Sequence, residues 1–391
     1  MIPDFYQFHL QTKVLFQEGI SRDFSNELDQ LGIKNYFIIC DPYFAENGVS
    51  DQIRQGVEQA GCRVVEIFCE IPPNSELKVV QKCSQLAKKK GAEGIIALGG
   101  GSSLDTAKAA NITFSLEGDL VEDYSGSQTI AQNLNPLIAI PTTAGTGSEV
   151  TSSAVILDEA GESKLSFNDS HLQPTLALLD PELTVTMPPK VTAMTGMDAL
   201  THAIESYTSL QANPMSDAFA MKAIKLIKEN LLLAVKNGED REARSRMLIA
   251  ANMAGIAFDH AMVGVVHSMS HATGGIAHVP HGLANSIFLP YGMEYNLEAS
   301  AERYAGIARR LGVDTRLLDH QEAARASIEF VKGLRTQLKE VCGLPDRLAE
   351  AGVEEGQLEP IAQAATEDGT SFFNPREVTY EGVLKKIKEA F

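Results

Sequence analysis

Five of the nine histidines in this 391-residue sequence lie between residues 260 and 281. Among them, His267 and His271 are four residues apart, so their side chains would share one face of a helix. A single helical histidine is usually a packing or surface residue, but apolar packing does not require so many imidazoles in one stretch. We therefore interpret the stretch as part of a metal site, and we assign His260 and His278 to structural or supporting positions.

Upstream residues with the same spacing would complete such a site. Asp198 and His202 fall within a helical pattern and are again four residues apart. His281 lies on an expected loop that could return to the same ion. One carboxylate and three imidazoles suit a divalent first-row metal such as Fe²⁺ or Zn²⁺. Four protein ligands with room for one more oxygen would form a Lewis-acid site.

A glycine-rich loop in the first half of the chain has features of a phosphate site. An apolar run at 94–98 leads into three glycines, and we expect Ser102 or Ser103 to cap the helix that follows. Glycines let the backbone approach a ligand closely, and the free N–H groups at a helix start favour a phosphate. Leu104 replaces the third glycine of the usual dinucleotide fingerprint, so a tight strand-to-helix turn is the alternative interpretation.

A second polar loop, residues 141–151, follows another expected strand and offers the hydroxyls of Thr142, Thr143 and Thr146. Ligands bind beyond the carboxyl ends of parallel strands, so these hydroxyls could hold a ribose or a diphosphate. The alternative is a capped turn. Asp41 ends an apolar run, where it could accept hydrogen bonds from an adenosine ribose and would repel a 2′-phosphate. It is equally suited to forming a turn.

The strands and helices expected in the first half of the chain must position these loops. Short, nearly continuous apolar runs alternate with helical stretches, which predicts a mainly parallel sheet covered on both faces. A hairpin is expected at 154–157 and 164–167, on either side of Glu159–Gly161. The expected strands of the sheet are 36–40, 63–68, 94–98, 136–140 and 175–179.

After about residue 186 the spacing of the apolar residues becomes helical. We therefore expect an α/β domain over 1–187 and an all-helical domain over 188–391. The expected helical stretches are 190–209, 216–235, 241–258, 300–311, 321–341 and 378–390.

Composition excludes several classes of protein. Lys and Arg number 33 against 51 Asp and Glu, a net charge of -18, which argues against binding to nucleic acid or to an anionic membrane. The sequence has no signal-peptide pattern and no run of ~20 apolar residues, so we expect no membrane span. The five cysteines include no C-x-x-C pair, which indicates reduced thiols in the cytoplasm.

Taken together, these motifs resemble those of the iron-containing (group III) alcohol dehydrogenases, a family that includes lactaldehyde reductases and 1,3-propanediol dehydrogenases. The similarity extends over essentially the full length. The matching segments are Gly99–Ser102 with Asp105, Pro141–Thr151, Thr195–Glu205, Ala212–Pro214, Val266–His267, Pro280–Gly282 and Asn374–Arg376.

The resemblance implies a dehydroquinate synthase-like fold, with an α/β dinucleotide-binding domain followed by an all-α domain. It implies NAD as cofactor and Fe²⁺ as the metal, with Zn²⁺ as the alternative ion. It places His271 beside the nicotinamide rather than on the metal. The implied metal ligands are Asp198, His202, His267 and His281. The implied cofactor contacts are Asp41, Asn74, Gly99, Gly100, Gly101, Ser102, Asp105, Thr142, Thr143, Thr146 and Lys164.

The activity that the resemblance implies is the NAD-dependent interconversion of small primary alcohols or diols and aldehydes, by a protein that self-associates as a dimer or larger assembly. A zinc-dependent glycerol dehydrogenase and a dehydroquinate synthase-like lyase are alternatives with the same fold. The lyase would need Lys or Arg near the metal, and residues 247–293 contain neither. An Fe²⁺ oxygenase would leave more metal positions open than four ligands do. A non-catalytic nucleotide-binding module would leave the histidines unexplained.

Overall fold

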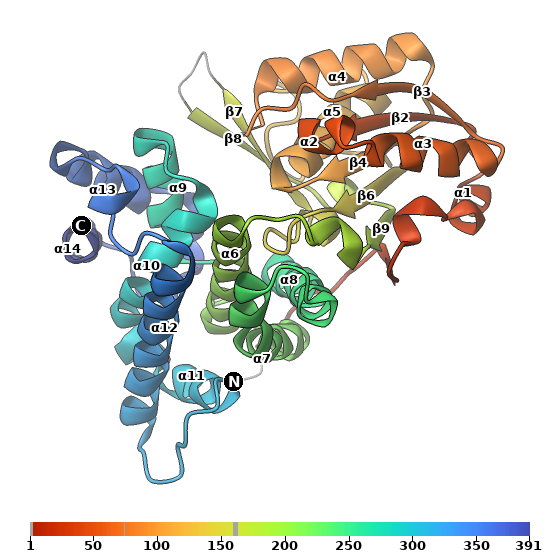
Figure 1. The fold of residues 1–391 in the computed structure, drawn as a ribbon. Helices are drawn as coiled ribbons and strands as arrows, with labels where there is room; N and C mark the ends of the chain where they lie inside the picture. Colours follow the sequence, from red (N-terminus) through yellow and green to blue (C-terminus); the bar gives the residue numbers. More distant parts are fainter. Residues whose placement is uncertain (1–2, 74, 159–162) are drawn as a thin grey trace. The chain divides into compact units, whose positions relative to one another are not determined.

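The computed structural model describes residues 3–73, 75–158 and 163–391, which form two compact units (Figure 1). The α/β unit comprises His9–Thr143 and Gly147–Thr184. The helical unit comprises Val185–Phe391 together with Ala144–Thr146 and the described part of Met1–Phe8. The predicted fold class, an α/β part with a parallel sheet and an all-helical part, is confirmed.

The α/β unit is built on a six-stranded parallel sheet with the strand order β1-β9-β6-β4-β2-β3. Five of these strands fall on the apolar runs that the sequence predicts. The pattern does not predict β1, because this strand is short, lies at the sheet edge and has exposed ends. The strands are β1 (Lys13–Phe16), β2 (Asn35–Cys40), β3 (Arg63–Phe68), β4 (Gly94–Gly99), β6 (Leu137–Pro141) and β9 (Leu176–Leu179).

Helices cover both faces of this sheet (Figure 1). On β2, Phe37 and Ile39 belong to a core that includes α4 and α5, whereas Tyr36 and Ile38 belong to a second core that includes α1, α2 and α3. Burial on both faces explains why the strands are almost continuously apolar. The helices are α1 (Ser25–Leu31), α2 (Pro42–Glu46), α3 (Val49–Gln59), α4 (Leu77–Lys90) and α5 (Gly101–Ser115).

The expected hairpin is present in the α/β unit. Strands β7 (Ser153–Asp158) and β8 (Ser163–Asn168) pair antiparallel. A two-residue strand, β5 (Gly126–Ser127), pairs with β8 in parallel. The connection that was expected at Glu159–Gly161 lies outside the described residues.

Among its described residues, the helical unit contains the six helical stretches that the sequence predicts and three further α-helices, α9, α10 and α13. The pattern does not predict these three, because α9 and α10 combine histidines, glycines and an internal Pro290, and α13 is short. The helices are α6 (Pro189–Thr208), α7 (Pro214–Lys236), α8 (Arg241–Ala261), α9 (Val265–Ala277), α10 (His281–Tyr295), α11 (Leu297–Arg310), α12 (His320–Cys342), α13 (Leu358–Glu367) and α14 (Tyr380–Ala390).

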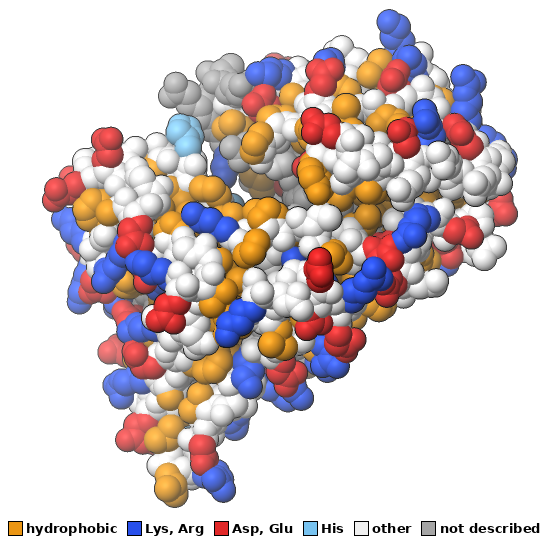
Figure 2. All heavy atoms as spheres, viewed as in Figure 1, with side chains coloured by type: hydrophobic (Ala, Val, Ile, Leu, Met, Phe, Trp, Pro, Cys, Tyr) orange, Lys and Arg blue, Asp and Glu red, His pale blue; other side chains and the backbone are white. Residues whose placement is uncertain are grey.

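Helix length and surface charge indicate whether a protein could cross a membrane or bind a polyanion. In the part of the chain that the structure describes, no single helix is long and apolar enough to cross a membrane. Helices α8 and α9 pass that test only as a pair, and they are bent by 103° at the break between them. On the face drawn in Figure 2, basic side chains are interspersed among acidic ones rather than gathered.

A buried arginine fixes the segment that leads into α6. Arg244 on α8 is 1% exposed. Its guanidinium donates to the carbonyls of Gly238 at 2.9 Å and Met187 at 3.0 Å. It also donates to the carbonyl of Val185 at 3.4 Å and to Thr192 Oγ1 at 2.7 Å. These acceptors lie just before α6, in its first turn and in the loop before α8, so one side chain joins the two helices.

Replacing Arg244 by methionine should destabilise the protein by about 2–4 kcal/mol, because several buried acceptors lose their donor. Urea unfolding followed by circular dichroism measures the change. The control is Arg246→Met on the same helix, which removes only an exposed ion pair with Glu242 and should change the unfolding midpoint little. Equal stability of the two variants would contradict the anchoring role of Arg244.

Candidate metal centre and glycine loop

The glycine loop lies between β4 and α5, and its glycines allow three segments to meet. Gly99 has a φ of 154°, and a Cβ there would collide with Ser103 and lie 3.2 Å from the Cβ of Asp41. A Cβ at Gly100 would lie 3.2 Å from the side chain of Thr143. The end of β2, the glycine loop and the loop after β6 therefore lie together at the carboxyl edge of the sheet. This edge is where α/β sheets bind ligands.

The start of α5 differs from the prediction in one respect. The N-cap is Gly100, and no described side chain caps this helix. The prediction that Ser102 or Ser103 caps it is wrong, because the helix begins at Gly101 and both serines fall inside its first turn. Ser102 Oγ instead donates to the carbonyl of Pro73. A helix start without a side-chain cap is the kind of position that favours an anion.

Two acidic side chains of the predicted cofactor site also shape the loops around it. Asp41 is the N-cap of α2, where its Oδ1 accepts from the N–H of Tyr43 at 2.9 Å. Asp105 accepts from Ser148 Oγ at 2.6 Å and from the N–H of Val155 at 3.1 Å, which ties α5 to β7 and the loop before it. Contacts of both residues with a cofactor stay predictions.

The remaining predicted cofactor residues lie in different parts of the chain. Thr142 is buried, and its N–H donates to the carbonyl of Gly99 at 3.0 Å, which joins the end of β6 to the glycine loop. Thr146 belongs to the helical unit, and Lys164 is exposed on β8. Asn74 lies outside the described residues.

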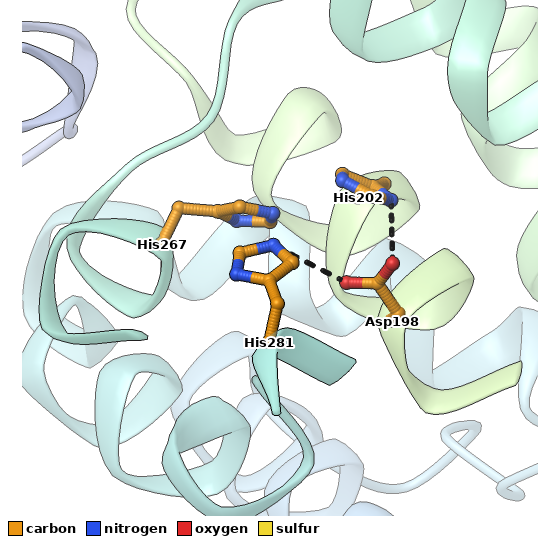
Figure 3. Close-up of side chains that lie close together, drawn as sticks. All are labelled: Asp198, His202, His267 and His281. Carbon is orange, nitrogen blue, oxygen red and sulfur yellow. Dashed lines mark ion pairs between the residues drawn. The ribbon is translucent and has the colours of Figure 1, made fainter. Parts of the chain in front are cut away.

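The four predicted metal ligands converge inside the helical unit (Figure 3). Asp198 and His202 come from α6, His267 from the start of α9 and His281 from the start of α10. One possible ligand atom from each residue lies within 4.8 Å of the other three. Asp198 Oδ1 is 3.6 Å from His281 Nε2, and Asp198 Oδ2 is 4.0 Å from His202 Nδ1. Three helices thus bring one carboxylate and three imidazoles to one point.

The structure corrects the expected position of His281 and shows where His267 and His271 lie. We expected His281 on a loop, but it is the first residue of α10 and follows the N-cap Pro280. His267, rather than His271, contributes to the four-residue group. The ring of His271 stacks on that of His281, with centroids 5.3 Å apart, and so lies beside the group.

The chemistry of this donor set fits a divalent cation. Burial lowers the pKa of His202 and of His267, so both imidazoles are neutral and offer lone pairs. His202 Nδ1 is buried, and none of the described residues forms a hydrogen bond with it. Buried polar atoms in proteins are nearly always satisfied, and a metal ion would satisfy this one together with the oxygens of Asp198.

A buried carboxylate that the sequence analysis did not assign supports His267. Glu205 Oε2 lies within hydrogen-bond distance of His267 Nδ1, at 2.5 Å, and Glu205 Oε1 accepts from the N–H of Val266 at 2.8 Å. Burial raises the pKa of Glu205 to about 7, against backbone hydrogen bonds that lower it. Its spacing was the available signal, because a residue three positions after His202 lies on the same face of α6.

An asparagine on α10 also contacts the ligand group and was not predicted. Asn285 Nδ2 donates to Asp198 Oδ1 at 2.7 Å. The same nitrogen is 3.2 Å from His267 Nε2 and 3.1 Å from His281 Nε2. Its position four residues after His281 places it on the same helix face. The amide therefore faces three of the four ligand side chains.

A second unpredicted carboxylate orients His271. Asp368 Oδ2 accepts from His271 Nδ1 at 3.0 Å, while its Oδ1 accepts from the N–H and hydroxyl of Thr370. Burial would raise the pKa of Asp368, but the hydrogen bonds from His271 and Thr370 outweigh it and lower the pKa to about 2. The two residues are 97 positions apart, so no local pattern could have paired them.

Comparisons with known proteins agree with the resemblance seen in the sequence. A family model for iron-containing alcohol dehydrogenase matches residues 11–181, and one for the C-terminal part of the Fe-containing alcohol dehydrogenase family matches residues 192–391. The chain is 38% identical to the NAD-dependent methanol dehydrogenase of Bacillus methanolicus over 383 residues, which is 98% of this chain and 99% of that protein. It is 36% identical to the 1,3-propanediol dehydrogenase of Citrobacter freundii over 363 residues, 92% of each protein.

Comparison with solved structures finds members of the same family. The crystal structure of a 1,3-propanediol oxidoreductase superimposes with a TM-score of 0.94 at 34% identity, covering 99% of this chain and 100% of that one. This agreement confirms the dehydroquinate synthase-like fold. Since both halves of the sequence match the family and the identity extends over nearly the whole chain, the protein belongs to the iron-containing alcohol dehydrogenase family.

Proposed function

We propose that this protein uses NAD and a divalent metal to interconvert small primary alcohols or diols with aldehydes. The observation that carries the proposal is the convergence of Asp198, His202, His267 and His281 in the helical core. The relatives are named for methanol and 1,3-propanediol, which supports a short alcohol as the substrate.

The four converging side chains are proposed to hold one divalent ion, Fe²⁺ by family membership, with Zn²⁺ suited to the same donors. When bound, such an ion supplies a Lewis acid for the alcohol oxygen. The protein's own part is to keep Asp198 and the three imidazoles at fixed positions. The buried surroundings favour this arrangement, because fixed charges and dipoles act more strongly away from water.

The α/β unit is proposed to bind NAD, in line with the predicted domain of residues 1–187, and the helical domain of 188–391 to hold the metal. The first N–H groups of α5 would bind the diphosphate. Asp41 would accept hydrogen bonds from the adenosine ribose and repel a 2′-phosphate. The further proposed contacts are Asn74, Gly99, Gly100, Gly101, Ser102, Asp105, Thr142, Thr143, Thr146 and Lys164.

His271 is proposed as the group that takes the proton released from the alcohol. A carboxylate can only accept, so the hydrogen shared with Asp368 resides on His271 Nδ1, and Nε2 keeps its lone pair. The side chain of His271 is 27% exposed, which lets the proton pass on to solvent. Histidine suits this task because its ordinary pKa is near neutrality.

The alcohol dehydrogenase names of the relatives support this activity over the dehydroquinate synthase-like lyase and the oxygenase. All five cysteines are unpaired, which supports a reducing, cytoplasmic location. Self-association is proposed from the family resemblance. The acidic composition supports a small-molecule substrate rather than nucleic acid or a membrane as the partner.

Replacing His267 by alanine should abolish stoichiometric metal binding and lower alcohol-dependent NAD reduction together, by at least about 100-fold. Metal analysis and steady-state kinetics on the same preparation measure both. The control is His278→Asn, because His278 is exposed and has a φ of 55°, which asparagine tolerates. Full activity with stoichiometric metal in His267→Ala would remove this residue from the ligand set.

Replacing Asp41 by asparagine should raise kcat/KM for NADPH relative to NADH by roughly tenfold, because the charge that repels a 2′-phosphate is lost while the α2 cap is kept. The control is Asp51→Asn, which changes an exposed carboxylate on α3. An unchanged NADPH-to-NADH ratio in Asp41→Asn would refute the role given to Asp41.

Replacing His271 by alanine should lower kcat by about 100-fold or more while the metal content stays stoichiometric. This combination separates a proton acceptor from a metal ligand. If His271→Ala retains the wild-type kcat, another group takes the proton. If it loses the metal, His271 belongs to the ligand set instead.

A further inference from the structure

We propose that Glu205 is a positioning residue for the metal site, because it fixes the orientation and the proton position of His267 and holds the start of α9 against α6. This inference rests on the proposed function, in which His267 binds the metal. Glu205 itself would touch neither the metal nor the substrate.

Glu205 lies on the face of α6 that carries two of the predicted metal ligands. Asp198, His202 and Glu205 follow one another at intervals of four and three residues, so they project from one face of the helix. Two of them point their polar atoms into the four-residue group, whereas Glu205 reaches across to α9. Glu205 is 5% exposed, and an acidic side chain is rarely so buried unless it is paired.

Glu205 also satisfies backbone groups at the start of α9. This helix begins at Val265 after Gly264 and has no side-chain cap of its own. Its first N–H groups are instead satisfied by distant side chains. Glu205 accepts from Val266 at 2.8 Å and from His267 at 3.3 Å, and Asn374 Oδ1 accepts from Val265 at 3.1 Å. A negative charge at a helix start is favourable, so the carboxylate stabilises α9 at the turn that carries His267.

The space around Gly264 confirms how closely these segments approach. A Cβ at Gly264 would lie 2.6 Å from Asn374 Oδ1 and 3.3 Å from Glu205 Oε1. Only glycine allows both side chains to reach the helix start. The contact between Glu205 and His267 is therefore built into the backbone path and is not a chance pairing of two surface groups.

Glu205 also contacts the imidazole ring of His267 directly. Glu205 Oε2 lies 2.5 Å from His267 Nδ1. Both oxygens of Glu205 already accept backbone N–H groups at the start of α9, so the group acts as an acceptor here and the hydrogen shared with His267 is placed on Nδ1. The lone pair of His267 then resides on Nε2, the atom that faces the amide of Asn285 at 3.2 Å. A carboxylate on the far nitrogen of a metal-binding histidine fixes the ring and makes it a stronger donor.

The variant that isolates this role is Glu205→Gln. Glutamine keeps the size and can still accept backbone N–H groups at the start of α9, but it is neutral and a poorer acceptor for His267 Nδ1–H. Zn²⁺ is the probe, and its affinity is measured on the full, metal-stripped chain by competition with a chromophoric chelator. We expect Glu205→Gln to bind Zn²⁺ about 10- to 100-fold more weakly than the wild type.

The matched control is Asn374→Ala, which removes the cap on Val265 without touching His267. We expect this variant to unfold at a lower temperature but to bind Zn²⁺ as the wild type does. If Glu205→Gln binds Zn²⁺ as tightly as the wild type, the proposal is overturned and Glu205 is only a helix cap. The proposal is also overturned if Glu205→Gln and Asn374→Ala lose Zn²⁺ affinity equally. If Glu205→Gln does not fold, Glu205→Asp takes its place, because it keeps the charge but moves the carboxylate away from His267 Nδ1. Weaker Zn²⁺ binding by Glu205→Asp is then the expected result, and wild-type affinity would overturn the proposal.

A wild-type protein that binds no Zn²⁺ and no Fe²⁺ would overturn the proposed function itself, and this inference with it. That result is distinct from tight wild-type binding that survives Glu205→Gln, which would overturn only the role of Glu205.

Discussion

The main constraint on the helical unit is that it buries a carboxylate and imidazoles side by side, away from water. Asp198, His202 and His267 are each at most 5% exposed, and their polar atoms face one another rather than solvent. Burying polar atoms costs free energy, which hydrogen bonds offset only in part. Other contacts must therefore hold together the three helices that carry these side chains.

Those contacts are made by side chains that would not bind the metal. Arg244 anchors the chain at the entry to α6, and Glu205 and Asn374 together satisfy the start of α9. Asn285 donates into the ligand group from α10. A buried polar side chain thus helps to fix each of the three helices that carry the predicted metal ligands. The α/β unit is organised differently. Its parallel sheet brings several loops to the same edge, and glycines let these loops approach one another.

Much of this arrangement could be predicted from local patterns. Strands buried on both faces appear as continuous apolar runs, and the pairs Asp198/His202 and His267/His271 share a helix face by spacing alone. The serine cap of α5 was predicted wrongly, because the helix start depends on where the chain bends at Gly100. Strand β1 was missed because an exposed edge strand has no apolar run to mark it.

The supporting residues could not be predicted in this way, because their partners are distant in sequence. Glu205 and His267 are 62 residues apart, and only the packing of α6 against α9 brings them together. The spacing of His267 and His271 alone does not decide which of them joins Asp198 and His202; the family resemblance implied His267, and the structure brings His267 into the four-residue group. Sequence spacing indicates which side chains can share a face, whereas the crossing of helices decides which faces meet.

The most direct test of the account is a crystal structure of the Zn²⁺-loaded protein with anomalous diffraction data collected at the zinc edge. We predict one strong peak at about 2.0–2.2 Å from an oxygen of Asp198 and from one nitrogen each of His202, His267 and His281. An anomalous peak elsewhere, or none at this group in protein shown to contain stoichiometric zinc, would contradict the assignment on which the proposed activity depends.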